Sequence, residues 1–313
     1  MLFDDEIKIS EYRSSNLKGF IYLLFPFTLA FLGVYLSLQE TYLFYIGQFL
    51  LGLFFFQCFI LLHEAGHSSY FKNKLLNKFF GNIFAFLSFI PYTSWVEIHN
   101  LHHKWTGYRD KDPTTEGTVN PNFGVFTTFL VNFSWIFWIP LFTIGYRIGN
   151  YWNLSKLKRH VSKNELSSII LNIVIQLLIY VVVFYFFGSW IVKHLLIAYL
   201  ISLIISDLFI LSQHSHIEIP IANQEAVRPL RYKDQIIYTR SLNIYRMIAK
   251  VFFLNFNLHE LHHAYPGLPA YYLDAIDSKT PNKVGFFAYL KDVKKMSGMN
   301  FVFRTSKKVI GKR

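Results

Sequence analysis

Long apolar segments separated by short polar ones dominate the pattern of this chain. Two such segments come first, at 20–38 and 42–62, and two more follow in the second half, at 169–187 and 191–211. Each has about the 20 residues that a helix needs to cross the core of a bilayer. We predict that these four segments are membrane-spanning helices arranged as two hairpins.

A fifth apolar segment, at 123–146, is predicted not to cross the membrane as a single span. The loop after it carries five basic residues: Arg147, Lys156, Lys158, Arg159 and Lys163. Basic loops favour the cytosolic side, and a crossing at 123–146 would place this one outside. Pro140 offers a break in the helix. We therefore expect this segment to lie in the membrane interface or to re-enter, which leaves every Lys and Arg except Lys193 on the cytosolic side.

The composition supports a membrane protein. Hydrophobic residues make up 53% of the 313 positions and charged residues only 16%, whereas an ordinary soluble domain has about 25% charged residues. The net charge of +12 comes from Lys and Arg that flank the apolar segments, so no nucleic-acid partner is expected. The prediction is an all-α integral membrane protein: one domain over 1–313, with about four transmembrane helices, interfacial helices and a cytosolic cap that carries histidine clusters.

The histidines are the strongest indication of chemistry. Ten of the twelve fall in four short groups: His63 and His67; His99, His102 and His103; His214 and His216; His259, His262 and His263. Residues three or four apart share one face of a helix, so each group directs its imidazoles to one side. Neutral imidazole is a good ligand for divalent iron. One ion cannot use so many nitrogens, so the pattern predicts two. The remaining two, His160 and His194, are interpreted as ordinary boundary residues.

Two other functions are consistent with part of this pattern. The segment His63-Glu64-Ala65-Gly66-His67 matches the HExxH signature of zinc proteases, but that signature does not include the two HxxHH groups. A histidine-lined metal transporter would place its ligands along a path near the middle of the membrane, whereas these groups follow helix ends on one side.

Taken together, HEAGH at 63–67, HNLHH at 99–103, QHSH at 213–216 and HELHH at 259–263 resemble the membrane fatty acid desaturase superfamily. The likeness covers roughly residues 40–273 and is greatest to the oleate and linoleate desaturases. It implies a non-haem di-iron centre that uses O2 to desaturate a fatty acyl lipid or acyl thioester. All ten clustered histidines are then candidate ligands, with His214 favoured over His216 because it is nearer the helix. Carotenoid ketolases and hydroxylases carry similar groups, and an acyl hydroxylase would share the site, so these alternatives stay open.

Several other residues are candidates for supporting roles. A ligating histidine usually donates its second N–H to a carboxylate or carbonyl, and Asp207, Glu64 and Glu260 are placed to accept it. Asp110 and Asp112 are further candidates, although acids in a loop are more often exposed to solvent.

The apolar residues Phe252, Phe253 and Phe256 are candidates for the wall of a substrate tunnel. The single cysteine excludes a cysteine-ligated iron–sulfur cluster, so electrons must come from a separate carrier, ferredoxin-like or haem-type. The expected location is the bacterial inner membrane or the endoplasmic reticulum, with the active site on the cytosolic side.

Overall fold

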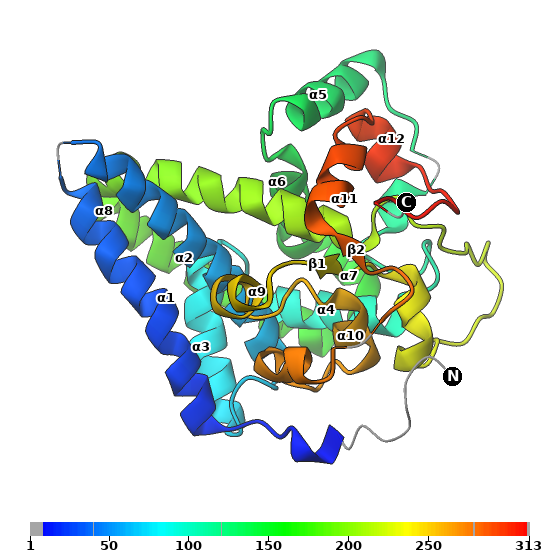
Figure 1. The fold of residues 1–313 in the computed structure, drawn as a ribbon, viewed down its shortest axis with the longest axis horizontal. Coiled ribbons are helices and arrows are strands. Elements are labelled where there is room, and N and C mark those ends of the chain that lie inside the picture. The colour runs from blue at the N-terminus through cyan, green and yellow to red at the C-terminus, as the bar shows by residue number, and fades with distance from the viewer. Residues whose placement is uncertain (1–8, 40, 120, 278, 312–313) are drawn as a thin grey trace. The chain divides into compact units, whose positions relative to one another are not determined.

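The computed structural model describes residues 9–39, 41–119, 121–277 and 279–311. Over these residues almost all the regular secondary structure is helical (Figure 1), and the strands are one parallel pair of two residues each, β1 (Leu242–Asn243) and β2 (Val284–Gly285). The contacts divide the chain into two compact units. One comprises Ser14–Glu97 and Arg147–Ser206, and we call it the membrane unit; the other comprises Met1–Arg13, Ile98–Tyr146 and Asp207–Arg313, and we call it the histidine unit because it carries eight of the twelve histidines.

The membrane unit contains the long apolar helices. Its elements are α1 (Asn16–Ser37), α2 (Leu43–Gly66), α3 (Lys74–Leu87), the start of α4 (Tyr92–Trp105), a π-helical turn (Ile148–Trp152), α7 (Leu154–His160) and most of α8 (Lys163–His214). Helix α2 packs against both α1 and α3. In the most apolar stretch of α2, 78% of the residues are buried, against 28% in α1 and 17% in α8. Helix α2 is therefore the central helix, while α1 and α8 expose apolar sides that lipid can solvate.

Within the described residues, α1, α2 and α8 are long and apolar enough to cross a membrane. Helix α8 has 52 residues, which would make it about 78 Å long if straight. It is not straight, because the ring of Phe89 lies 4.8 Å from that of Tyr180 and 4.9 Å from that of Tyr199. In a straight helix those two tyrosines would be about 28 Å apart. Helix α8 therefore folds back between them, as expected of two antiparallel spans at 169–187 and 191–211.

The segment predicted not to cross as one span is broken in the structure. Helix α5 (Val125–Ile136) and the helical stretch Leu141–Trp152, which begins with α6 (Leu141–Arg147), meet at an angle of 118°. The break contains Trp138, whose φ is +58°, and ends at Pro140. The break expected at Pro140 is therefore present, and the absence of a single crossing at 123–146 stays a prediction, because a bent pair of helices fits both a broken span and a re-entrant segment.

The histidine unit is built from short elements. Besides α5, α6 and the ends of α4 and α8, it contains α9 (Arg246–Phe253), α10 (His259–Ala264), α11 (Phe286–Val293), α12 (Gly298–Phe303) and the 3₁₀ helices Ile9–Glu11, Glu116–Thr118, Tyr232–Tyr238 and Ala270–Ala275. Its core joins the strand pair to α5, α11 and α12 through buried residues: Trp135, Leu242, Val284, Tyr289, Val293, Phe301 and Ile310.

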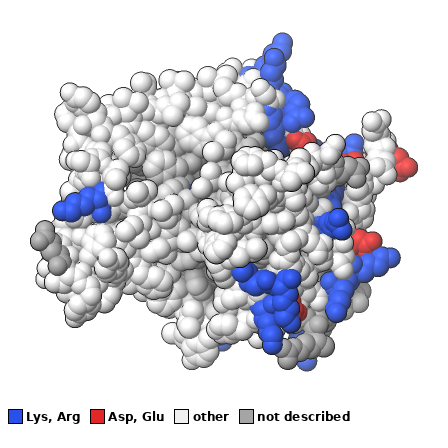
Figure 2. Space-filling model, turned by 90° about the horizontal axis from the view of Figure 1, so that it is seen from above, with Lys and Arg blue, Asp and Glu red and all other residues white. Residues whose placement is uncertain are grey.

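Charged residues are unevenly distributed on the surface. On the face drawn in Figure 2, uncharged side chains cover most of the area, and the Lys and Arg side chains gather in a few clusters. Many large apolar side chains of α1 and α8 are exposed, such as Phe31 at 73% and Tyr185 at 82%. An apolar surface of this extent is suited to lipid and not to water, so the fold is that of an all-α membrane protein.

Candidate metal centre

Four histidines of the histidine unit form one compact group. His102 lies on α4, His214 at the end of α8, and His259 and His263 on α10; one ring nitrogen from each lies within 4.8 Å of the others. The Nε2 atom of His259 lies 2.9 Å from that of His214 and 3.0 Å from that of His263. Nitrogens bound at right angles to one ion at about 2.1 Å are about 3 Å apart. The spacing therefore fits a shared metal ion.

The hydrogen bonds on the far sides of the rings set the protonation of this group. Nδ1 of His214 lies 3.0 Å from the carbonyl oxygen of Tyr238, and Nδ1 of His263 lies 3.0 Å from Oε1 of Gln235. Both oxygens only accept, so both Nδ1 atoms carry the proton and both Nε2 atoms are bare. If His259 carried a proton on Nε2, it could donate a hydrogen bond to Nε2 of His214 or of His263 but not to both. A cation can accept the lone pairs of all these nitrogens at once, so this set of ligand atoms fits a metal.

His263 is also held in the neutral form. Burial, reinforced by the neighbouring histidines His103 and His259, lowers the pKa of His263 well below its ordinary value. The neutral form is the one that binds a metal. The amide of Gln235 is itself oriented, because its Nε2 donates to the backbone carbonyl of His103 at 2.7 Å.

His102 is oriented by a buried carboxylate. Its Nδ1 lies 2.7 Å from Oδ2 of Asp112, and the two residues are only 4% and 3% exposed. Burial by itself raises the pKa of Asp112, but His102 and the two hydrogen bonds from Thr114 outweigh burial and lower it. Asp112 is therefore ionised and fixes the proton of His102 on Nδ1, which leaves Nε2 free to face the group. The expectation that Asp112 is exposed is wrong, whereas Asp110 is half-buried and accepts hydrogen bonds from the backbone N–H groups of Ala222 and Asn223.

Three more histidines of this unit form a second group. Nε2 of His103 lies 3.1 Å from Nε2 of His99 and 3.0 Å from Nε2 of His262. His99 and His103 are four residues apart on α4 and so share one face, and His262 comes from α10. All three are buried. The Nε2 atoms of this second group are spaced as closely as those of the first, so the group is suited to a second ion.

The first histidine pair of the sequence lies in the membrane unit, at the end of α2. The rings of His63 and His67 are 5.0 Å apart, and both pack against Trp95, at 5.5 and 6.3 Å. A Cβ atom at Gly66 would lie 2.1 Å from the Trp95 ring, so only glycine fits between these histidines. Nδ1 of His63 lies 3.0 Å from Oε1 of Glu64, as expected for a carboxylate that orients a ligand.

The structure does not bring His216 to either group. It follows the end of α8 in a left-handed conformation, with φ +57°, and its Nδ1 lies 3.1 Å from the carbonyl oxygens of Asn300 and Arg304. The sharp turn after α8 sends the two histidines of QHSH in different directions. His214 lies in the first histidine group, and His216 contacts the backbone at the C-terminal end of α12.

Two of the predicted supporting carboxylates bind backbone groups. Oδ1 of Asp207 accepts from the N–H of Thr143 at 2.6 Å, in the first turn of α6. Glu260 accepts from the N–H groups of Ser241 and Asn282 and from the hydroxyl of Thr280. Burial raises the pKa of Glu260 although these bonds oppose it. These acids hold the segments around the histidine groups in place.

The phenylalanines proposed for a tunnel lie beside α9 and α10. The ring of Phe253 packs 4.6 Å from that of Phe209, and Phe252 is also half-buried. Phe256 is only 6% exposed, and its ring lies 6.3 Å from that of His259. Phe256 is therefore the one of the three next to the metal-binding group.

Sequence reasoning missed two groups that orient the ligands, the Gln235 amide and the Tyr238 carbonyl. Both lie on the 3₁₀ helix Tyr232–Tyr238, more than 15 residues from any histidine group in the sequence. No motif marks this helix. A backbone carbonyl leaves no signal in a sequence, and an isolated Gln is common on any surface.

Comparison with known proteins gives a consistent family. The model of the family described as fatty acid desaturase matches residues 40–287. An sn-1 oleoyl-lipid 12-desaturase of Picosynechococcus is 25% identical over 91% of this chain and 83% of its own length. An sn-1 acyl-lipid omega-3 desaturase (ferredoxin) of Nostoc is 26% identical over 59% of this chain and 54% of its own length. An omega-3 fatty acid desaturase of Caenorhabditis elegans is 32% identical over 34% of this chain, but the match spans only 29% of that relative.

Proposed function

The chain belongs to the fatty acid desaturase family, and from this premise we propose that it is a membrane-bound oxidoreductase that introduces a double bond into a fatty acyl chain with O2. The carotenoid, transporter and protease alternatives are not favoured, because the relatives named above are all described as acyl desaturases. Two of them are described as acting on acyl lipids, so we propose an acyl lipid as the substrate class. We take both units to work as one catalytic domain over 1–313.

The observation that carries this proposal is the convergence of histidine Nε2 atoms in two groups of the histidine unit, at distances of 2.9–3.1 Å. We propose two iron ions as the cofactor. Seven ligands come from this unit: His99, His102, His103, His214, His259, His262 and His263. On the strength of the sequence pattern, we assign His63 and His67 of the membrane unit as ligands too. Bound iron would activate O2, which is the oxidant that removes hydrogen from an unactivated methylene; no side chain can do this.

The protein's own part is to orient these ligands and to exclude water. Asp112, Gln235 and the Tyr238 carbonyl each hold the proton of a ring on Nδ1, so that Nε2 stays available. Such partners also raise the basicity of the ligand. The burial of the ligands keeps the site dry, and a dry site protects reactive species from side reactions.

We propose that electrons reach the site from a separate protein. The chain has a single cysteine, Cys58, which is buried in α2, so it cannot bind an iron–sulfur cluster of its own. We propose a ferredoxin-like donor, in line with the description of the Nostoc relative. Residues 279–313 carry ten Lys and Arg, and we propose that this positive charge attracts an acidic carrier. We place this segment and the metal ions on the cytosolic side.

The test is to profile the lipids of a host that expresses the protein. The wild-type chain should add unsaturated acyl chains, and His102→Ala should abolish them. His160→Ala is the matched control, because it removes a histidine outside the groups and should leave the product unchanged. The purified protein should hold about two iron ions per chain. Unsaturated products that persist in His102→Ala, or a single zinc retained after iron-rich growth, would refute the proposal.

A further inference from the structure

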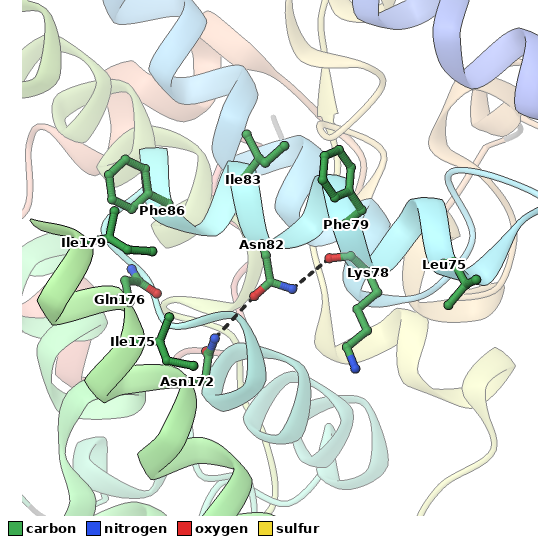
Figure 3. A pocket seen from close by; sticks show the side chains of 10 residues that line it. All are labelled: Leu75, Lys78, Phe79, Asn82, Ile83, Phe86, Asn172, Ile175, Gln176 and Ile179. Atoms are coloured by element: carbon green, nitrogen blue, oxygen red, sulfur yellow. Dashed lines mark hydrogen bonds between the residues drawn. The ribbon is translucent and has the colours of Figure 1, made fainter. Parts of the chain in front are cut away.

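A groove runs between α3 and the first arm of α8, within the membrane unit. It has a volume of about 560 Å³ and is lined by side chains of both helices (Figure 3): Leu75, Lys78, Phe79, Asn82, Ile83, Phe86, Asn172, Ile175, Gln176 and Ile179. No histidine lines it. The volume is in the range of small-molecule sites in proteins.

One end of the groove is polar and positively charged. Lys78 is exposed and makes no ion pair within the described residues. Two further exposed lysines, Lys72 and Lys74, lie at the start of the same helix. Next to Lys78, Asn82 accepts a hydrogen bond from Nδ2 of Asn172 at 3.3 Å and donates to the carbonyl of Lys78 at 2.8 Å (Figure 3). A hydrogen-bonded amide pair therefore bridges the two helices beside an unpaired cation.

The other end of the groove is apolar apart from Gln176, whose amide donates to the hydroxyl of Tyr180 and the carbonyl of Ile90. Ile83, Ile175 and Ile179 are 39%, 47% and 46% exposed, and Phe86 closes this end (Figure 3). Phe86 also lines a second cavity of about 380 Å³, which reaches Trp190 and is walled almost wholly by apolar side chains. The two cavities thus adjoin and extend the apolar surface away from Lys78.

The dimensions match one chain of a lipid. Leu75 and Phe86, the outermost groove residues on α3, are eleven positions apart, which is about 16 Å along a helix, and the second cavity lengthens the path. Because α8 is a candidate membrane span with exposed apolar residues, the molecules available to cover this groove are lipids. A lysine at one end then selects for a negative headgroup.

We propose that this groove is a binding site for an anionic glycerophospholipid, with its phosphate at Lys78 and one acyl chain along Ile83, Ile175, Ile179 and Phe86. The site is separate from the histidine groups and does not depend on the proposed reaction. The bound lipid would fill the space between α3 and α8 and so hold the α8 hairpin against α3.

The proposal can be tested on the full-length protein in nanodiscs that contain a phosphatidylglycerol with a photoreactive diazirine on its acyl chain. Irradiation and peptide mass spectrometry should place the label on α3 and on residues 172–179 of α8. The same probe with a phosphatidylcholine headgroup should label these peptides more weakly. One lysine near a membrane surface contributes about a fivefold change in binding, so Lys78→Gln should lower the phosphatidylglycerol labelling by about that factor.

Two matched pairs of variants complete the experiment. Lys74→Gln removes a neighbouring charge that does not line the groove and should lower the labelling by much less than Lys78→Gln does. Ile179→Trp fills the apolar end and should reduce labelling by both lipids, whereas Leu177→Trp, on the same helix but outside the lining, should not. Equal labelling by the two headgroups, or equal effects of Lys78→Gln and Lys74→Gln, would overturn the proposal. An unchanged gel-filtration profile and thermal unfolding midpoint serve as the check that each variant is folded.

Discussion

Replacement of Asp112 by asparagine is the most direct test of how the ligands are oriented. Asp112→Asn keeps the size of the side chain but removes its charge. In the wild-type protein, Oδ2 of Asp112 accepts from Nδ1 of His102 at 2.7 Å, and both side chains are almost completely buried. An asparagine amide can present either its oxygen or its nitrogen to His102. In the second case the proton of His102 moves to Nε2 and blocks the ligand atom.

The expected loss follows from the type of bond. A hydrogen bond to a charged partner contributes about 1.5–3 kcal/mol, and removal of the partner of a metal-ligating histidine typically costs about 10- to 100-fold in metal affinity or activity. The two ranges agree, since tenfold corresponds to about 1.4 kcal/mol. Thr114 also bonds to Asp112 and lies 3.1 Å from Nδ1 of His102. It can retain part of the orientation, so we expect a loss near the middle of this range.

The measurement is the iron content of the purified protein under titration with a competing chelator, together with the acyl products of the host. Asp110→Asn is the matched control, because Asp110 accepts only from backbone N–H groups of Ala222 and Asn223 in the structure. It should change metal affinity by less than about threefold. If Asp112→Asn and Asp110→Asn lose metal equally, or if neither loses any, the assigned role of Asp112 is wrong.

Three further outcomes are expected. His214→Ala should lose metal, whereas His216→Ala should retain it, because only His214 lies in a histidine group; metal analysis of both proteins decides this, and the opposite result would reverse the assignment. Cysteines introduced at Ser162 and Asn100, both exposed, should be labelled from the cytosolic side in a background without the native cysteine; labelling of Ser162 only from outside would mean that residues 123–146 cross the membrane. Phe256→Ala should move the double bond or change the preferred chain length with metal content unchanged, as read by mass spectrometry of host lipids; a lower protein yield with the same products would show that Phe256 only packs in the core.

The membrane-spanning elements were predictable because the hydrocarbon core of a bilayer restricts the backbone conformation of a segment within it. A segment in lipid must satisfy all its backbone polar groups internally, so long apolar runs become helices, and the runs at 20–38 and 42–62 correspond to α1 and α2. The break near Pro140 was predictable for a related reason, since proline lacks the N–H that a continuous helix needs. The fold-back of α8 has a weaker local signal, because the chain stays helical through Gly188. Charge distribution, and not local propensity, indicated a hairpin there.

The clustering of the histidines was predictable, because helical spacing alone aligns His99 with His103 and His259 with His263. The choice between His214 and His216 depends on a single backbone conformation. If the helix continued, His214 and His216 would be two residues apart and would point to different sides of it. In the structure, α8 ends at His214, and the chain turns through a positive φ at His216. Proximity to the helix therefore selects the histidine that lies in a group, but the sequence could not supply the carbonyl partners at Asn300 and Arg304 that hold His216 away.

The groups that fix which ring nitrogen of each histidine carries the proton cannot be identified from a single sequence. His214 and His263 both depend on the 3₁₀ helix Tyr232–Tyr238, which supplies one side chain and one backbone carbonyl. A ligand motif must keep its residue types, because only imidazole nitrogens at fixed spacing bind the metal. An oxygen that accepts a ring N–H can come from a carboxylate, an amide or any peptide bond, so its identity is free and only its position is constrained. Position is a property of the tertiary fold. The histidines of such a site can therefore be predicted from the sequence. The groups that accept their ring N–H protons can be identified only from the structure.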